Sequence, residues 1–172
     1  MKAAALAVLV LLAASPAVAQ SAAQPKICDK PVYRQFDFWV GRWDVARTSG
    51  GPVVGHSLIE KLFGDCVLRE TWTGLGGSTG GSLNMYQDTT GRWRQTWADS
   101  VGNWTEYWGQ RVGADMRFIA IDTNRRTGAP TVHRMTFSPL PGGAVRQLIE
   151  VSTDGGSGWT VDSDLTYRRA GD

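Results

Sequence analysis

The feature that most constrains the fold is a series of about ten short runs in which the character of the side chains alternates with a period of two. In one of them, Trp93, Gln95 and Trp97 alternate with Arg94 and Thr96. A period of two places successive side chains on opposite faces of a β-strand. The runs lie near 41–48, 53–63, 66–73, 81–87, 92–99, 103–111, 115–121, 130–138, 144–153 and 158–168.

The segments between these runs are rich in glycine, proline, asparagine and aspartate, as at 88–91 and 139–143. These residues favour tight turns. Evenly spaced strands joined by tight turns predict an antiparallel meander, and a sheet of this many strands removes its exposed edges most simply by closing. We therefore predict an all-β domain over residues 31–169, an up-and-down antiparallel β-barrel of about ten strands. A two-sheet sandwich is the less favoured alternative.

The stretch FDFWVGRWDV, residues 36–45, concentrates aromatic side chains directly before the first expected strand. A small barrel leaves an opening at each end of its core. We expect a short helical turn carrying Phe36, Phe38 and Trp39 to close one end. Gly41 would then let the chain bend into the first strand, and Trp43 would point inward as the floor of the barrel.

The first residues have the pattern of a secretory signal peptide. Lys2 precedes an apolar run at 3–14, and Ala17-Val18-Ala19 is a typical cleavage site, so we predict a signal peptide over residues 1–19. An uncleaved anchor is the alternative, but the apolar run is short for one. Residues 20–30 are small and polar and are expected to form a flexible arm. The protein is thus predicted to be secreted or periplasmic.

The charge balance argues against partners that need a strongly charged surface. Without Lys2 the chain has 17 basic and 16 acidic residues, and it contains no basic run. Neither nucleic acid nor an anionic membrane is therefore expected as a partner. After cleavage no remaining apolar stretch is long enough to span a membrane, and no feature predicts an oligomeric state.

The two cysteines are Cys28 and Cys66. In an exported protein an even pair usually closes, so we predict a disulfide that ties the N-terminal arm to an early strand. Two free thiols are the alternative.

Gly41-Arg42-Trp43 resembles the G-x-W signature of the lipocalin and calycin superfamily, in which a basic residue of the last strand lies over the tryptophan. That resemblance implies this role for Arg168 or Arg169. The wider pattern, including QFDFWVGRWDV, CVLRETWTG and SLNMYQDTTGRWRQTWADS, resembles a family of bacterial secreted or periplasmic proteins with a lipocalin-like barrel. This resemblance covers nearly the whole mature chain. It implies a fold and a location but no reaction.

Several runs place polar side chains in phase with large aromatic ones, as a small-molecule pocket requires. If these faces point inward, the lumen has aromatic walls with a few polar groups. A shift of one residue in register would exchange the two faces, and a packed or water-filled lumen is the alternative. The candidate ligand-binding residues are Glu70, Trp72, Asn84, Tyr86, Gln95, Trp97, Trp104, Glu106, Trp108, His133, Arg146 and Glu150.

Glu70 and Glu106 are the most informative carboxyl groups, because each is expected in the middle of a strand beside tryptophan. A buried carboxylate pairs with a cation or takes up a proton. Arg94, Arg134 and Arg146 are the available partners. A structural ion pair is at least as well supported as acid–base chemistry.

The two histidines, His56 and His133, do not form a cluster with metal-ligand spacing, so no metal site is predicted. The resemblance to calycin-type barrels, which include haem-binding nitrobindin-like proteins, leaves haem at His133 as a minor possibility. We otherwise expect no cofactor.

The sequence supports a binding barrel for a partly apolar small molecule as the first hypothesis. A calycin-type isomerase or lyase that uses lumen carboxylates is the second, and a ligand-free envelope protein the third. A carboxyl group or histidine without a charge partner beside an open cavity would favour the enzyme.

Overall fold

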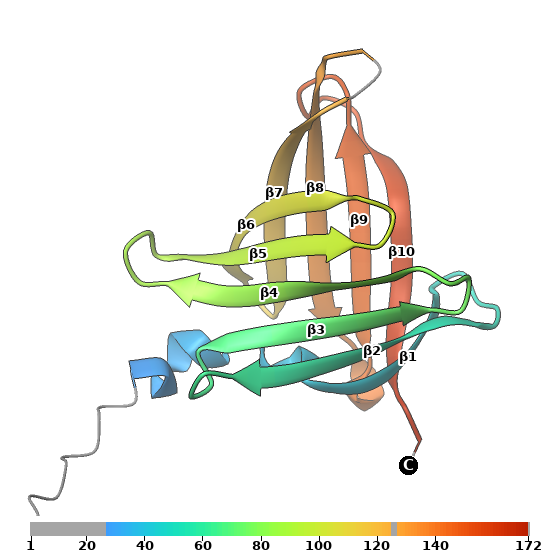
Figure 1. Cartoon of the computed structure of the whole chain (residues 1–172). Coiled ribbons are helices and arrows are strands. Elements are labelled where there is room, and N and C mark those ends of the chain that lie inside the picture. Colours follow the sequence, from blue (N-terminus) through green and yellow to red (C-terminus); the bar gives the residue numbers. More distant parts are fainter. Residues whose placement is uncertain (1–26, 125–126, 172) are drawn as a thin grey trace, which may run out of the picture.

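The computed structural model describes residues 27–124 and 127–171, and the predicted signal peptide lies outside them. Ten antiparallel strands form one closed barrel in which each strand pairs with its neighbours in sequence and β1 pairs with β10 (Figure 1). The strands are β1 (Gly41–Arg47), β2 (Val53–Leu62), β3 (Val67–Gly74), β4 (Thr79–Gln87), β5 (Arg92–Asp99), β6 (Trp104–Val112), β7 (Asp115–Thr123), β8 (Pro130–Pro139), β9 (Val145–Ser152) and β10 (Thr160–Arg169).

This architecture confirms the predicted up-and-down barrel and excludes the open sandwich. The strands β2–β5 run across the view of Figure 1, and β7–β10 run up it, with β6 curving between the two groups. The ring closes where β1 meets β10, with Trp43 opposite Arg169 and Arg47 opposite Leu165. Every strand is therefore paired on both sides, which removes the exposed edges that favour aggregation.

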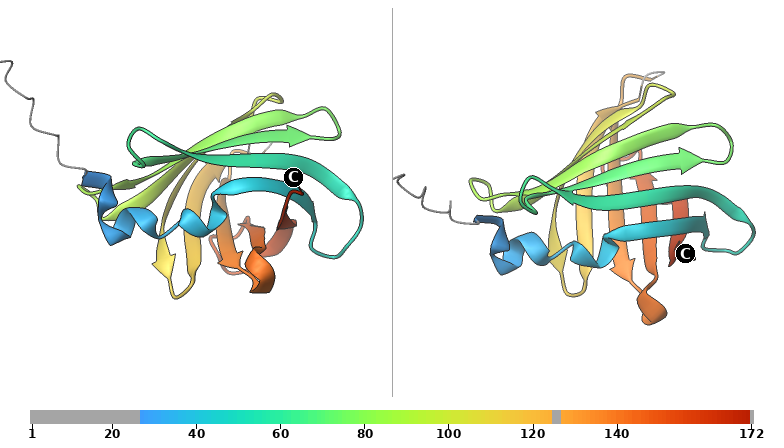
Figure 2. Two further views of the ribbon diagram at one scale, coloured as in Figure 1. Left: turned by 90° about the horizontal axis from the view of Figure 1, so that it is seen from below. Right: turned by 60° about the horizontal axis from the view of Figure 1, so that its bottom comes forward.

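Three short 3-10 turns precede the first strand: η1 (Ile27–Asp29), η2 (Pro31–Arg34) and η3 (Asp37–Trp39). A fourth, η4 (Pro141–Gly143), joins β8 to β9. Seen from below in Figure 2, the N-terminal turns lie between the two groups of strands, across the lower end of the barrel. The helical turn predicted before the first strand is therefore present.

The predicted disulfide joins Cys28 of η1 to Cys66, the residue before β3, with 5.0 Å between the Cα atoms. Cys28 is 4 % exposed. The described part of the expected flexible arm, residues 27–30, thus includes a 3-10 turn that is bonded to the barrel. The physical reason is the cross-link, which removes most of the freedom that its polar composition suggests.

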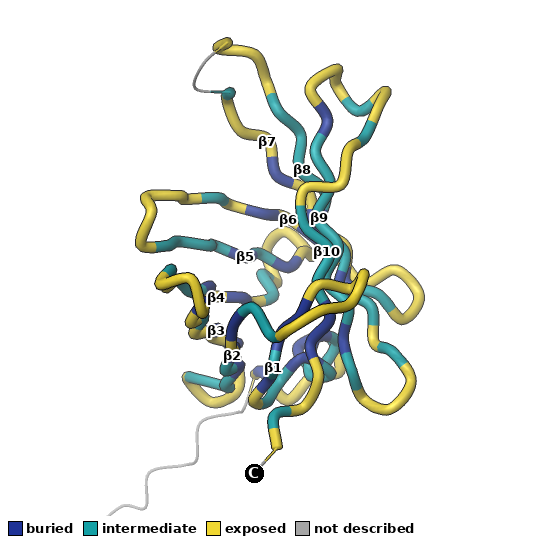
Figure 3. The backbone as a smooth tube through the Cα atoms, turned by 90° about the vertical axis from the view of Figure 1, so that its right-hand side faces the viewer, coloured by how far each residue is buried: buried dark blue, intermediate teal, exposed yellow. Residues whose placement is uncertain are grey.

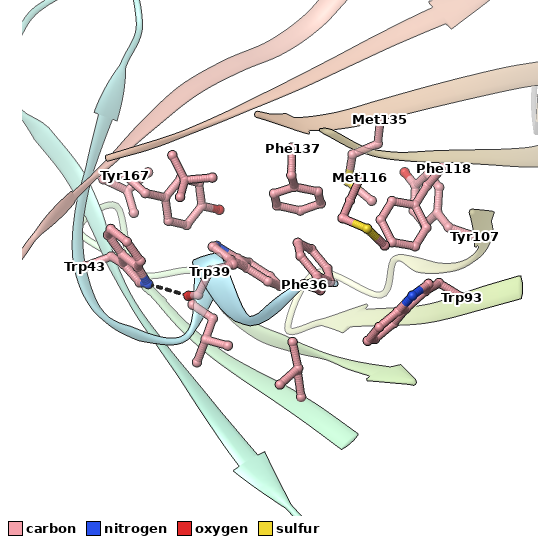
Figure 4. Packing of buried hydrophobic residues seen from close by; sticks show 14 of the residues in the cluster. Phe36, Trp39, Trp43, Trp93, Tyr107, Met116, Phe118, Met135, Phe137 and Tyr167 are labelled. Atoms are coloured by element: carbon pink, nitrogen blue, oxygen red, sulfur yellow. Dashed lines mark hydrogen bonds between the residues drawn. The ribbon is translucent and has the colours of Figure 1, made fainter. Parts of the chain in front are cut away.

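Aromatic side chains from η3 and its flanks close the lower end of the barrel (Figure 4). Phe36 and Trp39 are completely buried and stack with their ring centres 5.0 Å apart. The ring centres of Trp39 and Phe137 of β8 are 4.6 Å apart. Trp43 Nε1 donates a hydrogen bond of 2.8 Å to the Trp39 carbonyl oxygen. The plug and the inward floor residue follow the sequence expectation, with Phe38 only partly buried at the margin.

Arg169, and not Arg168, covers the floor tryptophan. The Arg169 guanidinium carbon lies 3.9 Å from the centre of the Trp43 ring, whereas Arg168 is exposed opposite Asp44. Alternation along β10 explains the correction, because Arg169 is directly opposite Trp43 in the register and directly opposite residues share a face. Gly41 has a φ of +139°, and a Cβ there would lie 1.9 Å from Arg169 Nη1.

No helix among the described residues has the length and apolar character that crossing a bilayer requires.

Candidate functional site

The barrel interior contains a cavity of about 420 Å³ at the end away from the aromatic plug. Its wall includes Asn103 of the β5–β6 turn, Asp122 near the end of β7 and Asp162 near the start of β10. The mouth therefore lies where β7 ends and β10 begins, and the described residues beyond these strand ends are largely exposed (Figure 3). The volume lies within the range of roughly 300–1,000 Å³ that is usual for small-molecule sites.

A directed chain of hydrogen bonds that runs along β4 and across to its neighbouring strands reaches the cavity. Gln95 Nε2 donates to Asn84 Oδ1 at 2.6 Å, and Asn84 Nδ2 donates to Ser82 Oγ at 2.9 Å. Ser82 then donates to Glu70 Oε2 at 3.0 Å, and Ser57 donates to Glu70 Oε1 at 2.9 Å. All five side chains are buried, so the chain converges on one carboxyl group inside the barrel.

Glu70 is 4 % exposed and lines the cavity. Burial raises its pKa to about 7, although the hydrogen bonds from Ser57 and Ser82 act in the opposite direction by stabilising the ionised form. Among the described residues no lysine or arginine forms an ion pair with it. Glu70 is thus a carboxyl group that can gain or lose a proton near neutral pH beside an open cavity.

A second set of polar contacts lies on the opposite wall. The Tyr167 hydroxyl donates to Gln147 Oε1 at 2.9 Å, and Gln147 Nε2 contacts Met135 Sδ at 3.2 Å. Burial, followed by the charge of Glu70, raises the pKa of Tyr167 well above its usual range. Burial, and then Asp162 and Asp122, raise the pKa of Tyr107 to about 12. Both phenols are therefore neutral at physiological pH.

The structure brings half of the predicted ligand-binding residues to the cavity wall. These are Glu70, Trp72, Gln95, Trp97, Trp104 and His133. Asn84 is completely buried in the hydrogen-bond chain rather than on the wall. Tyr86 lies near the plug, where its ring contacts those of Tyr33 and Trp93.

Glu106 and Trp108 do not face the lumen, contrary to the expectation from the sequence. Both are exposed on the outer face of β6, where Glu106 Oε2 accepts a hydrogen bond of 2.5 Å from Arg94. The Arg94 guanidinium carbon lies 3.8 Å from the centre of the Trp108 ring. This carboxylate therefore belongs to an ion pair on the outside of the barrel.

The register of the β5–β6 hairpin explains this correction. Trp97 lies opposite Thr105, Gln95 opposite Tyr107 and Trp93 opposite Gly109. Because directly opposite residues share a face, an inward Trp97 requires Thr105 and Tyr107 to point inward and Glu106 to point outward. Trp104, at the first position of β6, is 63 % exposed and reaches the cavity only at its rim.

Arg146 and Glu150 likewise lie on the outer face, on strand β9. Arg146 Nε and Nη2 donate to the two carboxylate oxygens of Asp164 at 2.8 and 2.7 Å, and Arg134 forms a similar pair with Glu150 at 2.6 and 2.8 Å. Their neighbours Gln147 and Ile149 line the cavity instead. The polar pattern that suggested a binding face is therefore a ladder of cross-strand ion pairs.

Many residues of the site were not predicted, among them the polar residues Ser57, Ser82, Tyr107, Asp122, Gln147, Asp162 and Tyr167. Small serines give no signal of their own, because their role depends on which carboxyl group lies on the next strand. The loop length of the β5–β6 hairpin, combined with an inward Trp97, was the one sequence signal that could have placed Tyr107.

His133 is half-buried on the cavity wall, so the residue on which the haem hypothesis depends does face the lumen. Within residues 27–124 and 127–171 no group of three or more His, Cys, Asp or Glu side chains has the arrangement of a metal site. No protein-family model matches the sequence, and no curated protein matches it either.

Proposed function

We propose that this protein is an exported, lipocalin-like barrel that binds a small, partly apolar molecule in the cavity at its open end. The observation that carries the proposal is the convergence of a buried polar network on a cavity with aromatic walls. Trp72, Trp97 and Tyr107 supply apolar contact area, and Glu70 and Gln95 supply polar groups of fixed position. This combination is typical of small-molecule sites.

The disulfide between Cys28 and Cys66 supports export, because such bonds persist in oxidising compartments. The contact of Arg169 with Trp43, next to Gly41, supports the lipocalin-like assignment. Neither feature bears on the identity of the ligand.

The test is a ligand screen by native mass spectrometry and intrinsic tryptophan fluorescence, with a variant that fills the cavity. Ile149→Trp places an indole on the cavity wall, whereas Leu148→Trp places the same group on the outer face of the same strand. We expect ligands to bind the wild type and the Leu148→Trp variant but not the Ile149→Trp variant. Binding that survives in Ile149→Trp would place the site elsewhere and contradict the proposal.

A second candidate function follows from Glu70 alone. A carboxyl group with a pKa of about 7 that forms no ion pair within the described part of the chain suits a general acid or base at neutral pH. An isomerase or lyase that uses it would move a C–H proton of the bound molecule. We would then expect deuterium from D₂O to enter a bound compound with the wild type but not with Glu70→Gln, while both proteins still bind it. If no bound compound takes up deuterium, the enzyme hypothesis is contradicted and only the binding function remains.

A further inference from the structure

Acidic side chains line the cavity of this barrel, whereas arginines of the surrounding strands lie on its outer face. Among the described residues three carboxyl groups line the cavity: Glu70 deep inside, and Asp122 and Asp162 at the rim. The described part of the lining contains no lysine or arginine, and no described lysine or arginine pairs with either aspartate. The cavity wall therefore carries an excess of negative charge.

Three arginines of the strands that line the cavity are on the outer face. They are Arg94 of β5, Arg134 of β8 and Arg146 of β9. Each forms an ion pair with a carboxylate on the outer face, so none of them neutralises the carboxyl groups of the lumen. The same two aspartates, Asp162 and Asp122, add to the effect of burial in raising the pKa of the Tyr107 hydroxyl.

The hydrogen-bonding groups that face the cavity are also suited to a cation, because most of them are acceptors. The Ser57 and Ser82 hydroxyls and both N–H groups of Asn84 are already used as donors, and Gln95 uses one of its two N–H groups on Asn84. Gln95 is 3 % exposed and lines the cavity, and its Oε1 accepts no hydrogen bond from any described residue. The polar floor thus presents mainly acceptors, because the carboxyl group of Glu70 and the amide oxygen of Gln95 stand beside a single remaining N–H group of Gln95.

We propose that the cavity selects a small organic cation, an amine on an aromatic or aliphatic body, and excludes organic acids. The ammonium N–H groups donate to Glu70 and to Gln95 Oε1, and the faces of Trp72, Trp97 and Tyr107 surround the body and the charge. Aromatic faces attract cations, and charge-assisted hydrogen bonds are stronger than neutral ones. An organic acid would place a second carboxylate beside Glu70 with no counter-ion, which is costly in a buried site. This inference rests on the proposed binding function and names its ligand class.

The experiment compares ligands of one shape and different charge. Two series are titrated into the full chain without its first 19 residues: 2-phenylethylamine, 2-phenylethanol and 3-phenylpropionate, and then hexylamine, hexanol and hexanoate. At pH 8 we expect the amines to bind about tenfold tighter than the alcohols, with the carboxylates weakest. Calorimetry gives the affinities, and NMR shifts of the indole N–H signals show whether the cavity is occupied.

Glu70→Gln and Glu106→Gln are matched variants, because both remove one carboxylate from a strand and only the first faces the cavity. Glu70→Gln should reduce the preference for amines to about threefold or less and leave alcohol binding unchanged, since Coulomb attraction to Glu70 is lost. Glu106→Gln should retain the full preference. Equal or tighter binding of the carboxylates, or a preference for amines that survives in Glu70→Gln, would overturn the inference and leave the binding function standing. If no member of either series binds the wild type, and none emerges from the wider screen, both proposals fail.

The pH dependence provides a second readout. The ionisable groups that line the cavity are Glu70, Tyr107, Asp122, His133, Asp162 and Tyr167. Amine affinity should rise about tenfold between pH 5.5 and pH 8 as Glu70 ionises, while the amine stays protonated. The rise should persist in His133→Gln and disappear in Glu70→Gln. A rise that disappears in His133→Gln instead would assign the selectivity to the histidine and contradict the inference.

Discussion

Arg169 joins the end of the chain to its first strand through Trp43. Its guanidinium carbon lies 3.9 Å from the centre of the Trp43 ring, and its Nη1 donates a hydrogen bond of 2.7 Å to the carbonyl oxygen of Val40. One side chain thus connects β10, β1 and the turn that carries the plug. The contact lies at the closed end of the barrel, away from the cavity mouth.

Replacing Arg169 with glutamine should lower the free energy of unfolding by about 1–2 kcal/mol, because a cation–π contact and a hydrogen bond from a charged donor are lost. Arg168→Gln is the matched control, since Arg168 is exposed and is not over the indole. It should change stability by no more than about 0.5 kcal/mol. Chemical denaturation measures both, and a larger loss for Arg168 would contradict the assignment.

Gly41→Ala should destabilise the protein by at least about 2 kcal/mol, because a φ of +139° strains an L-residue and the new Cβ would overlap Arg169 Nη1. The overlap disappears when Arg169 is shortened. The double variant Gly41→Ala/Arg169→Ala should therefore lose less stability than the sum of the two single variants. If the losses of unfolding free energy in the two single variants add up to the loss in the double variant, then Arg169 is not the reason that position 41 requires glycine.

Trp43→Phe should cost about 1–2 kcal/mol more than Trp39→Phe. Trp43 Nε1 donates to the Trp39 carbonyl oxygen, so its removal deprives a buried acceptor of this hydrogen bond. Trp39 Nε1 is buried without a hydrogen-bond partner in the described structure, and its removal abolishes an unsatisfied donor. Both changes remove similar ring volume, so the difference in unfolding free energy isolates the hydrogen bond. An equal cost would show that packing alone holds Trp43.

Glu70 should make the unliganded protein less stable as pH rises from about 4.5 to 7. Its folded pKa of about 7 lies above the unfolded value of 4.5, so the folded state binds the proton more tightly. The favourable contribution is complete below pH 4.5 and is lost as pH rises through 7, by about 3 kcal/mol in total. Denaturation at several pH values should show this decline in the wild type and in Glu106→Gln, and not in Glu70→Gln. The same decline in Glu70→Gln would assign it to another group.

Replacing Cys28 and Cys66 by serine should lower stability by about 4 kcal/mol in the chain-entropy model, since the bond closes a loop with a sequence separation of 38. The barrel strands should still form, because neither cysteine lies in a strand. Circular dichroism in the absence of denaturant checks the second point and denaturant titration the first. An unchanged midpoint would show that the cross-link adds nothing to stability.

The alternation of side chains and the spacing of turn residues determined the number of strands, their order and the closure of the barrel. These are local properties, because period-two patterning and turn chemistry act over a few residues. The aromatic run before Gly41 similarly predicted the plug, and the two cysteines predicted their own bond.

Only the tertiary structure decided which carboxyl group faces the cavity. Glu70 and Glu106 have the same sequence context, an acidic residue two positions from a tryptophan. Cross-strand register turns Glu106 outward to Arg94 and leaves Glu70 inside with Ser57 and Ser82. A shift of one residue in a single hairpin exchanges the two faces, so the chemistry of the lumen depends on pairings between strands that no local pattern specifies.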